Sequence, residues 1–170
     1  MKKLLFFAAF AVFAFTTSSA QGEFRAGIDV GLPIGDAGDL STFVIAVDLG
    51  YLFDLSSNIK AGPIAGYSHS FGDDVTEGPF TVEIDDIQFI PVGAGGRFNV
   101  SDNFSLGADV GYAIGINDNN DGGFYYAPRT SYYAGQSVYI VAAYRGVALD
   151  NGSWDIISIG IEFGIGGSGE

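Results

Sequence analysis

The sequence has no cysteine and few basic residues, and both shortages exclude functions. Its 170 residues include seven Lys or Arg and twenty Asp or Glu, for a formal net charge of −13. Two of the seven, Lys2 and Lys3, start the chain, so residues 21–170 carry 5 − 20 = −15. Without cysteine the chain forms no disulfide and no Cys–His metal site. Without a basic patch, nucleic acid is excluded as a partner.

The chain also lacks helical periodicity and any hydrophobic run of membrane-helix length. The apolar run Leu4–Phe15 is well short of the ~20 residues that a membrane-spanning helix needs. The chain has 26 glycines and 15% aromatic residues, a composition that disfavours helices and favours strands. We therefore expect an all-β protein.

Residues 1–20 have the layout of a secretory signal peptide. Lys2 and Lys3 precede the apolar run, and Ser18 and Ala20 stand at the spacing that signal peptidase prefers. We expect cleavage before Gln21 and export across the inner membrane of a bacterium. Residues 21–170 then have the length of one domain.

Segments of alternating apolar and small or polar residues follow one another along the rest of the chain. They cover approximately residues 24–32, 43–53, 59–71, 81–98, 104–116, 124–133, 138–148 and 154–165. The links after the second, fourth and sixth segments are short, whereas the links after the odd-numbered segments are generally longer and acidic. This order predicts an eight-stranded antiparallel up-and-down β-barrel, which leaves no exposed sheet edge.

The stretch NFSLGADVGYAIGI, residues 103–116, shows why the faces of these strands are unusual. Bulky apolar residues alternate with glycine and Asp109, where a water-facing strand would carry Lys, Glu and Thr. In the fourth segment, Pro91 and the glycines of 93–96 predict a bulge that could shift the register. Aromatic residues gather near segment ends, Trp154 among them, and suit a membrane interface.

Nine charged residues of the segments, all five cations among them, share the glycine-rich face, where cations nearly balance acids. They are Arg25, Asp29, Asp48, Lys60, Arg97, Asp109, Arg129, Arg145 and Glu162. The opposite face is apolar and too large to leave in water. We expect the charged face to form a lumen charge network and the apolar face to contact lipid, as in a transmembrane barrel.

The pattern resembles the small eight-stranded outer-membrane β-barrel proteins of the OmpA transmembrane domain and OmpX type, within the broad outer membrane protein β-barrel domain group. The most specific element is the last segment, whose spacing is similar to their assembly signal: Ser158, Gly160, Phe163 and Ile165. In that signal the last residue is often an aromatic that ends the chain, whereas here GGSGE follows Ile165. The resemblance implies the cell outer membrane as location, with outer-membrane lipids and the barrel-assembly machinery as partners.

Candidate sites for chemistry are few. His69, the single histidine, adjoins Ser68 and Ser70, but neighbouring strand residues face opposite sides and no carboxylate partner is evident. Residues 117–123 have the spacing of a calcium loop only at their start, so they predict a hairpin loop. The acids of the longer links, including Asp85 and Asp86, could bind divalent cations at the cell surface. We expect no cofactor, no resident metal and no enzymatic activity.

The sequence favours a structural or surface-interaction protein whose lumen is filled by side chains, because eight strands leave little interior space. Two alternatives remain open at this stage. One is a narrow pore or carrier for small solutes, in which the same charges line a path. The other is a soluble periplasmic β-barrel that binds a hydrophobic ligand.

Overall fold

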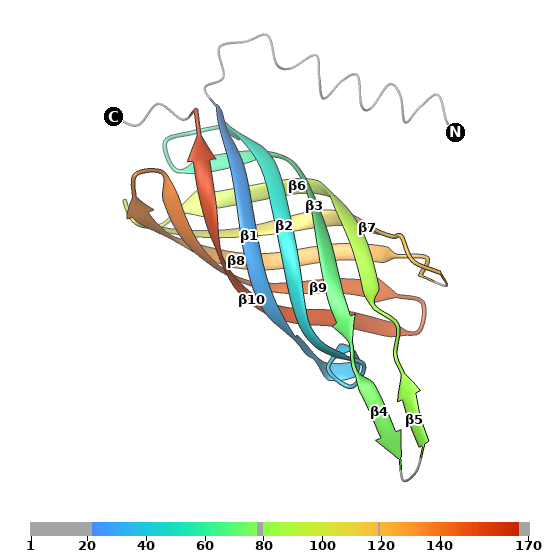
Figure 1. Ribbon diagram of the computed structural model, residues 1–170. Coiled ribbons are helices and arrows are strands. Elements are labelled where there is room, and N and C mark those ends of the chain that lie inside the picture. Colours follow the sequence, from blue (N-terminus) through green and yellow to red (C-terminus); the bar gives the residue numbers. More distant parts are fainter. Residues whose placement is uncertain (1–21, 78–79, 119, 167–170) are drawn as a thin grey trace, which may run out of the picture.

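The computed structural model describes residues 22–77, 80–118 and 120–166, and for 75–77 and 80–83 it describes the backbone alone. Eight strands close into an antiparallel barrel in the order β1-β10-β9-β8-β7-β6-β3-β2 (Figure 1). The barrel strands are β1 (Gly22–Ile34), β2 (Ser41–Asp54), β3 (Ile59–Gly72), β6 (Ile87–Asn99), β7 (Phe104–Gly115), β8 (Gly123–Gly135), β9 (Val138–Leu149) and β10 (Gly152–Ile165). The prediction of an all-β eight-stranded barrel is confirmed.

A seam between the first and last strands closes the barrel. Strand β1 pairs with β10 without interruption from Phe24 opposite Ile165 to Ile34 opposite Asp155. Because every barrel strand has two neighbours, the backbone groups of its ladder are paired within the sheet, as a bilayer requires. In the described part of the chain, no helix is both long enough and apolar enough to cross a membrane.

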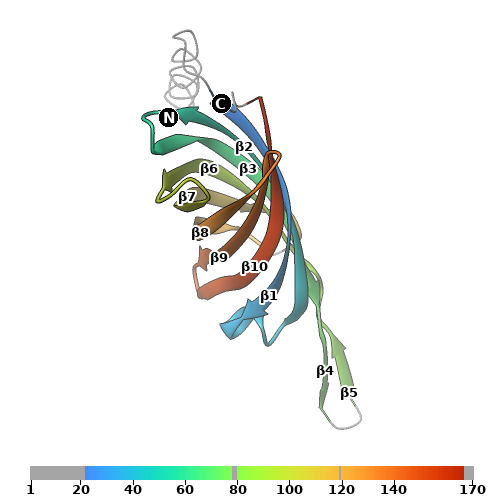
Figure 2. The ribbon, with the colours of Figure 1, turned by 90° about the vertical axis from the view of Figure 1, so that its left-hand side faces the viewer.

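The two ends of the barrel differ (Figures 1 and 2). At one end, called here the terminal end, lie the start of β1, the end of β10 and the short turns that follow β2, β6 and β8. The opposite, loop end carries the 3-10 turn η2 (Gly35–Ala37) and a separate hairpin of β4 (Asp74–Glu77) and β5 (Phe80–Glu83). This β4–β5 hairpin projects beyond the barrel in both views.

The prediction of one strand over residues 81–98 is wrong. The segment divides into β5, which belongs to the projecting hairpin, and β6, which belongs to the barrel. The division falls at Asp85 and Asp86, and the Asp86 carboxylate accepts the backbone N–H of Gly72 at 3.0 Å. This hydrogen bond joins Asp86 to Gly72, the last residue of β3. The chain passes at Asp86 from the hairpin into the barrel strand β6.

The predicted bulge around Pro91 is also wrong, since the pairing of β6 with β3 and with β7 keeps one register throughout. The glycines here serve a close approach of two strands instead. Gly93 faces Gly111 across the β6–β7 pair, and a Cβ atom on either would lie 2.7 Å from the Cα of the other. Register shifts occur elsewhere, between Ser41 and Phe43 and between Tyr133 and Gly135.

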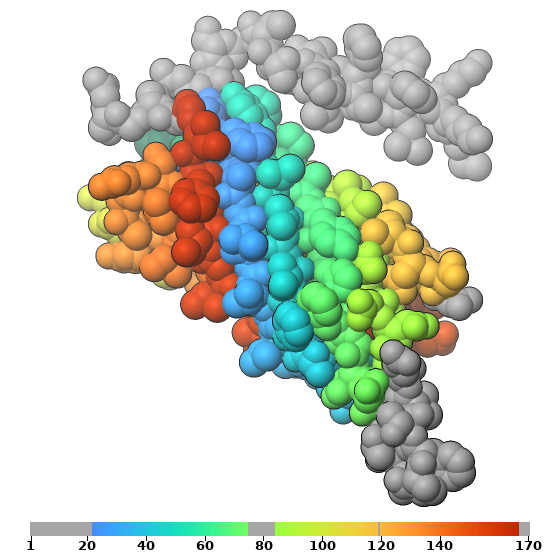
Figure 3. Space-filling view, viewed as in Figure 1, coloured from blue at the N-terminus to red at the C-terminus, as the bar shows by residue number. Residues whose placement is uncertain are grey.

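The bulky apolar side chains point away from the barrel axis. In β7, Leu106, Val110 and Tyr112 are about half exposed, whereas Asp109 is 4% exposed and Ala113 is buried. The same alternation of exposed and buried side chains runs along β1, β2 and β10, three strands that lie side by side on the face seen in Figure 3. The interior of the stretch 103–116 is thus the face of Asp109, and the apolar belt is the surface that lipid covers.

A charge placed on the apolar belt should destabilise the barrel strongly in lipid. Ile28 points outward, is 53% exposed and pairs with Ile161 and Val47 in the belt. We expect Ile28→Arg to lower the free energy of unfolding in phospholipid vesicles by about 2–4 kcal/mol. Urea titration measures the change, with Leu55→Arg in the terminal turn as the control that should cost little. Equal costs for both variants would contradict a lipid-facing belt.

Candidate functional site

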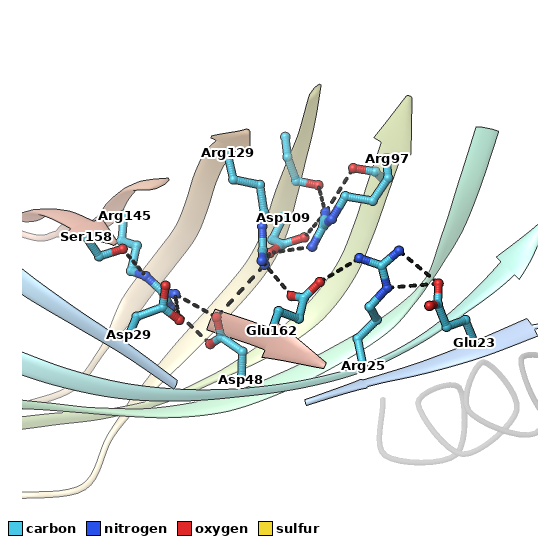
Figure 4. A network of polar contacts seen from close by, with 12 residues as sticks. Glu23, Arg25, Asp29, Asp48, Arg97, Asp109, Arg129, Arg145, Ser158 and Glu162 are labelled. Carbon is cyan, nitrogen blue, oxygen red and sulfur yellow. Dashed lines mark hydrogen bonds and ion pairs between the residues drawn. The ribbon is translucent and has the colours of Figure 1, made fainter. Parts of the chain in front are cut away.

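The lumen divides into three levels between the terminal end and the loop end. The first is a cavity at the terminal mouth, called here the terminal vestibule. The second is a layer of ion pairs across the middle of the barrel, the charged layer (Figure 4). The third, toward the loop end, is an apolar layer. Each layer is built from side chains that alternate inward along the strands.

Arg129 on β8 joins two parts of the charged layer. Its guanidinium lies 3.1 Å from Asp109 Oδ2 on β7 and 2.6 Å from Glu162 Oε2 on β10. Asp109 also accepts a hydrogen bond from Arg97 of β6 at 2.6 Å. All four side chains are less than a tenth exposed, so each carboxylate has a cation within contact distance inside the barrel. Buried charges are tolerated only when they are paired in this way.

A second group surrounds Arg145 on β9 (Figure 4). Its guanidinium lies 2.9 Å from Asp29 Oδ2 and 2.6 Å from Asp48 Oδ2, and its Nε donates to Ser158 Oγ at 3.0 Å. Asp48 belongs to β2, so this contact crosses the lumen. A span of this kind ties strands together that are not neighbours in the sheet.

A third group, around Arg25, includes a residue that the sequence analysis missed. Arg25 lies 2.8 Å from both Glu23 and Glu162, and its guanidinium covers the ring of Tyr139 at 3.7 Å. Lys60 lies at the edge of this group, 3.6 Å from Glu23 and 2.8 Å from Asp54. Glu23 is 5% exposed and precedes the first predicted strand by one residue.

Glu23 could have been found by extending the alternation one step toward the N-terminus, since it shares the parity of Arg25. With Glu23 included, and apart from the exposed Asp54, the charged layer and its edge hold five cations and five acids. These are Arg25, Lys60, Arg97, Arg129 and Arg145, with Glu23, Asp29, Asp48, Asp109 and Glu162.

Two inward glycines make room for this layer. A Cβ atom on Gly107 would lie 2.7 Å from Arg97 Cδ, and one on Gly160 would lie 2.6 Å from Asp29 Oδ1. Any larger side chain at these positions would displace a buried charged group or the facing backbone. At these two positions, glycine is therefore needed because it leaves room for the neighbouring side chains and backbone, and not because of its backbone flexibility.

The apolar layer was not foreseen. It is a buried cluster at the loop end of the lumen that includes Phe89, Tyr125, Trp154 and Ile156. Trp154, which the sequence analysis placed at a membrane interface, points inward, is 5% exposed and donates its Nε1–H to Ser70 Oγ at 3.0 Å. Trp154 faces inward because it follows the same alternation along β10 as Ser158 and Ile156, which are buried on the inner face.

The four residues of the resembled assembly signal divide between the two faces of β10. Ser158 points inward to Arg145, and Gly160 adjoins Asp29. Phe163 and Ile165 point outward and are 49% and 59% exposed. These positions fit β10 as the closing strand at the seam; their part in assembly stays a prediction.

His69 has a carboxylate partner, which corrects the sequence analysis. Its Nε2 lies 2.8 Å from Asp86 Oδ2, and its Nδ1 lies 3.0 Å from the hydroxyl of Tyr67. Ser68 and Ser70 are buried on the opposite, inner face of β3. The outward group of Tyr67, His69 and Asp86 therefore lacks the neighbouring serines, and it clamps the base of the β4–β5 hairpin to β3.

The clamp predicts a pH effect at the loop end. The pKa of the Asp86 carboxyl is lowered, chiefly because it accepts the backbone N–H of Gly72 and also because it contacts His69. A lowered folded-state pKa means that the contact stabilises above the ordinary carboxyl pKa of about 4 and is lost as the pH falls through the folded value. We expect the Gly72 amide resonance to show a titration step below about pH 4.

This step should be absent in Asp86→Asn and kept in Asp85→Asn, whose side chain is an exposed neighbour. NMR spectra recorded at falling pH measure it. A step that persists in Asp86→Asn would contradict the assignment to this carboxyl.

The acidic links do not gather into a metal cluster in the described ranges: no group of three or more His, Cys, Asp or Glu side chains there could hold an ion. Single acids such as Asp36 and Asp121 lie on different loops. Binding of divalent cations by these loops therefore has no preformed site among the described residues.

Comparison with known proteins decides the family. Residues 4–164 match the family described as "Outer membrane protein beta-barrel domain". The chain belongs to this family. An outer membrane protein β-barrel domain with its apolar face outward is not a soluble barrel with an apolar interior, so that alternative is wrong.

Solved structures share the fold of this outer membrane β-barrel domain. Ail, the attachment invasion locus protein of Yersinia pestis, is 16% identical over 87% of this chain and 100% of that chain, with a TM-score of 0.58. A de novo designed transmembrane β-barrel is 14% identical over 87% of this chain and 98% of its own, with a TM-score of 0.55. Ail has also been solved in complex with the heparin analogue sucrose octasulfate. Among the curated proteins, none matches this chain.

Proposed function

We propose that this chain is a surface-interaction protein whose barrel serves as a closed membrane anchor and whose β4–β5 hairpin binds another protein. The observation that carries the proposal is the hairpin itself. Strand β4 pairs with β5 from Asp74 opposite Glu83 to Glu77 opposite Phe80. Neither strand has a second partner among the described residues. Unpaired strand edges are templates for a strand of another chain.

The charge of the hairpin region selects the partner. Residues 73–86 contain acids and no Lys, Arg or His; the acids are Asp73, Asp74, Glu77, Glu83, Asp85 and Asp86. The partner we propose is a basic protein segment that can extend as a strand. A polysulfated ligand such as the one in the Ail complex is disfavoured here, because like charges repel at the binding surface.

The lumen supports the role of closed anchor. Between the terminal vestibule and the loop end, two cavities lined by described residues have volumes of about 10 Å³ each, no more than a single water needs. The charged layer and the apolar layer lie at these levels. This filling supports a closed barrel over the pore alternative.

A synthetic peptide of alternating Lys and Val tests the proposal against folded protein in nanodiscs. We expect binding that weakens at least tenfold when salt screens the charges. Replacing residues 74–83 by a two-residue turn should abolish it, whereas Asp36→Asn with Asp39→Asn on the neighbouring loop should not. Binding that survives the loss of the hairpin, or no binding at low salt, would overturn the proposal.

The proposed surface role also needs export and a loop end outside the cell. Residues 1–21 lie outside the described residues, so cleavage before Gln21 stays a prediction. The mass of the protein extracted from outer membranes tests it, and a mass that includes residues 1–20 would contradict it. A protease site inserted after Glu77 should be cut by protease added to intact cells if the hairpin is outside.

A further inference from the structure

The terminal vestibule is large enough to hold more than solvent. Its volume is about 240 Å³, which is that of about eight water molecules at ~30 Å³ each. The two cavities deeper in the lumen have about 10 Å³ each. The vestibule is thus a separate space, bounded by the charged layer and open toward the terminal mouth, where residues of the β6–β7 and β8–β9 turns line it.

One wall of the vestibule is neutral and rich in hydrogen-bonding groups. Asn99, Ser105 and Ser131 line it side by side, since Asn99 pairs with Ser105 and Ser105 pairs with Ser131 across adjacent strands. The Ser131 hydroxyl is buried, the residue being 2% exposed, and it has no hydrogen-bond partner among the described residues. A buried hydroxyl without a partner costs free energy, and rotation about the Cα–Cβ bond of Ser131 can turn it toward a group in the cavity that this residue lines.

The opposite wall carries Glu23, Arg25 and Lys60, whose charges are already paired, and Asp102 adds a carboxylate at the mouth. Arg25 contacts Glu23, and Lys60 contacts both Glu23 and Asp54. An anion in the vestibule would approach the Glu23 carboxylate, and a cation would approach Arg25 and Lys60. A ligand without net charge avoids both repulsions, and the polar lining disfavours an apolar one.

Two tyrosines add apolar surface with polar tips to the lining. The rings of Tyr133 and Tyr139 lie 5.1 Å apart at a tilt of 47°, and the Tyr139 hydroxyl donates to Glu23 Oε1 at 3.1 Å. Because Arg25 already covers the Tyr139 ring, Tyr133 is the one that offers a ring face and a hydroxyl to a ligand with both C–H faces and hydroxyl groups. Sugars combine these features with neutrality.

We propose that the terminal vestibule binds a small neutral polyhydroxy ligand of about monosaccharide size, with Ser131 as one of its hydrogen-bond partners. Because the vestibule is open at the mouth, such a sugar can be a free molecule or one unit of a glycan chain. Both sources share the chemistry, and they differ in whether longer glycans bind more tightly. The proposal is independent of the hairpin.

NMR titration of the folded barrel tests the site, in a phosphocholine detergent rather than a maltoside, whose head group is itself a sugar. The probes are N-acetylglucosamine and its tetramer. We expect saturable shifts at the amides of Ser105, Ser131 and Tyr133. Ser131→Ala should weaken binding about tenfold, which corresponds to one lost hydrogen bond. Ser131→Leu, which fills the cavity, should abolish it. Ser57→Leu in the exposed β2–β3 turn is the matched control and should bind as the unchanged protein does.

Comparison of the monomer with the tetramer shows whether the ligand is a free sugar or a glycan chain, and two further results would overturn the proposal. A tetramer that binds at least tenfold more tightly than the monomer assigns the site to a glycan chain, and equal affinities assign it to a free sugar. No shifts with either probe up to about 100 mM would overturn the proposal, since the vestibule would then hold water only. Unchanged binding by folded Ser131→Leu would overturn it too, because the shifts would come from another surface.

Discussion

Replacing Arg129 by alanine should lower the free energy of unfolding by about 3–5 kcal/mol. Arg129 lies within 3.1 Å of Asp109 and 2.6 Å of Glu162, and the two carboxylates are about 5% exposed. After the substitution, Asp109 keeps Arg97 and Glu162 keeps Arg25, but the lumen holds one uncompensated negative charge. Urea titration in phospholipid vesicles measures the loss.

A double variant separates the charge from the loss of packing. Arg129→Met with Glu162→Gln removes one cation and one acid, and it leaves Arg97 with Asp109 and Arg25 with Glu23. Because exchanging a buried ion pair for neutral groups of similar size is often nearly neutral, we expect the double variant to recover most of the lost stability. A double variant that is less stable than Arg129→Ala would contradict a charge-balanced lumen.

Replacing Trp154 by alanine should cost a further large amount, about 3–5 kcal/mol, for a different reason. Trp154 is 5% exposed within the apolar layer, near Phe89 and Ile156, and its loss leaves a cavity and removes the donor to Ser70 Oγ. Trp154→Phe keeps most of the volume and loses the hydrogen bond, so it should cost about 1–2 kcal/mol. Equal costs would show that the indole does not fill the lumen.

The sequence reveals which face of a strand a residue lies on, but not its depth in the barrel, and the predictions for Arg129 and Trp154 depend on both. The period of two in a strand assigns each residue to a face, which is why Arg129 and Asp109 could be placed inside. It does not say at which depth along the barrel axis a side chain lies. Strand tilt and stagger decide depth, so the contact of Arg145 on β9 with Asp48 on β2 could not be predicted.

Depth also explains why the apolar layer was missed. Val44 and Leu52 stand on the glycine-rich face in the sequence, yet only Val44 joins the buried cluster of the apolar layer. The contact of His69 with Asp86 was missed for another reason. Residues 74–83 fold into the hairpin between them, which returns Asp86 to the end of β3. A single strand over 81–98 would have placed Asp86 on the barrel wall.

We propose that the barrel is a closed anchor and not a conduit for ions or small solutes. Single-channel recording in planar bilayers tests it most directly, with the unchanged protein and with Asp109→Ala. Asp109 lies in the charged layer, 4% exposed, between Arg97 and Arg129. We expect no steady conductance from the unchanged protein. Steady channels whose conductance or selectivity changes in Asp109→Ala would contradict it, because ions would then pass through the charged layer.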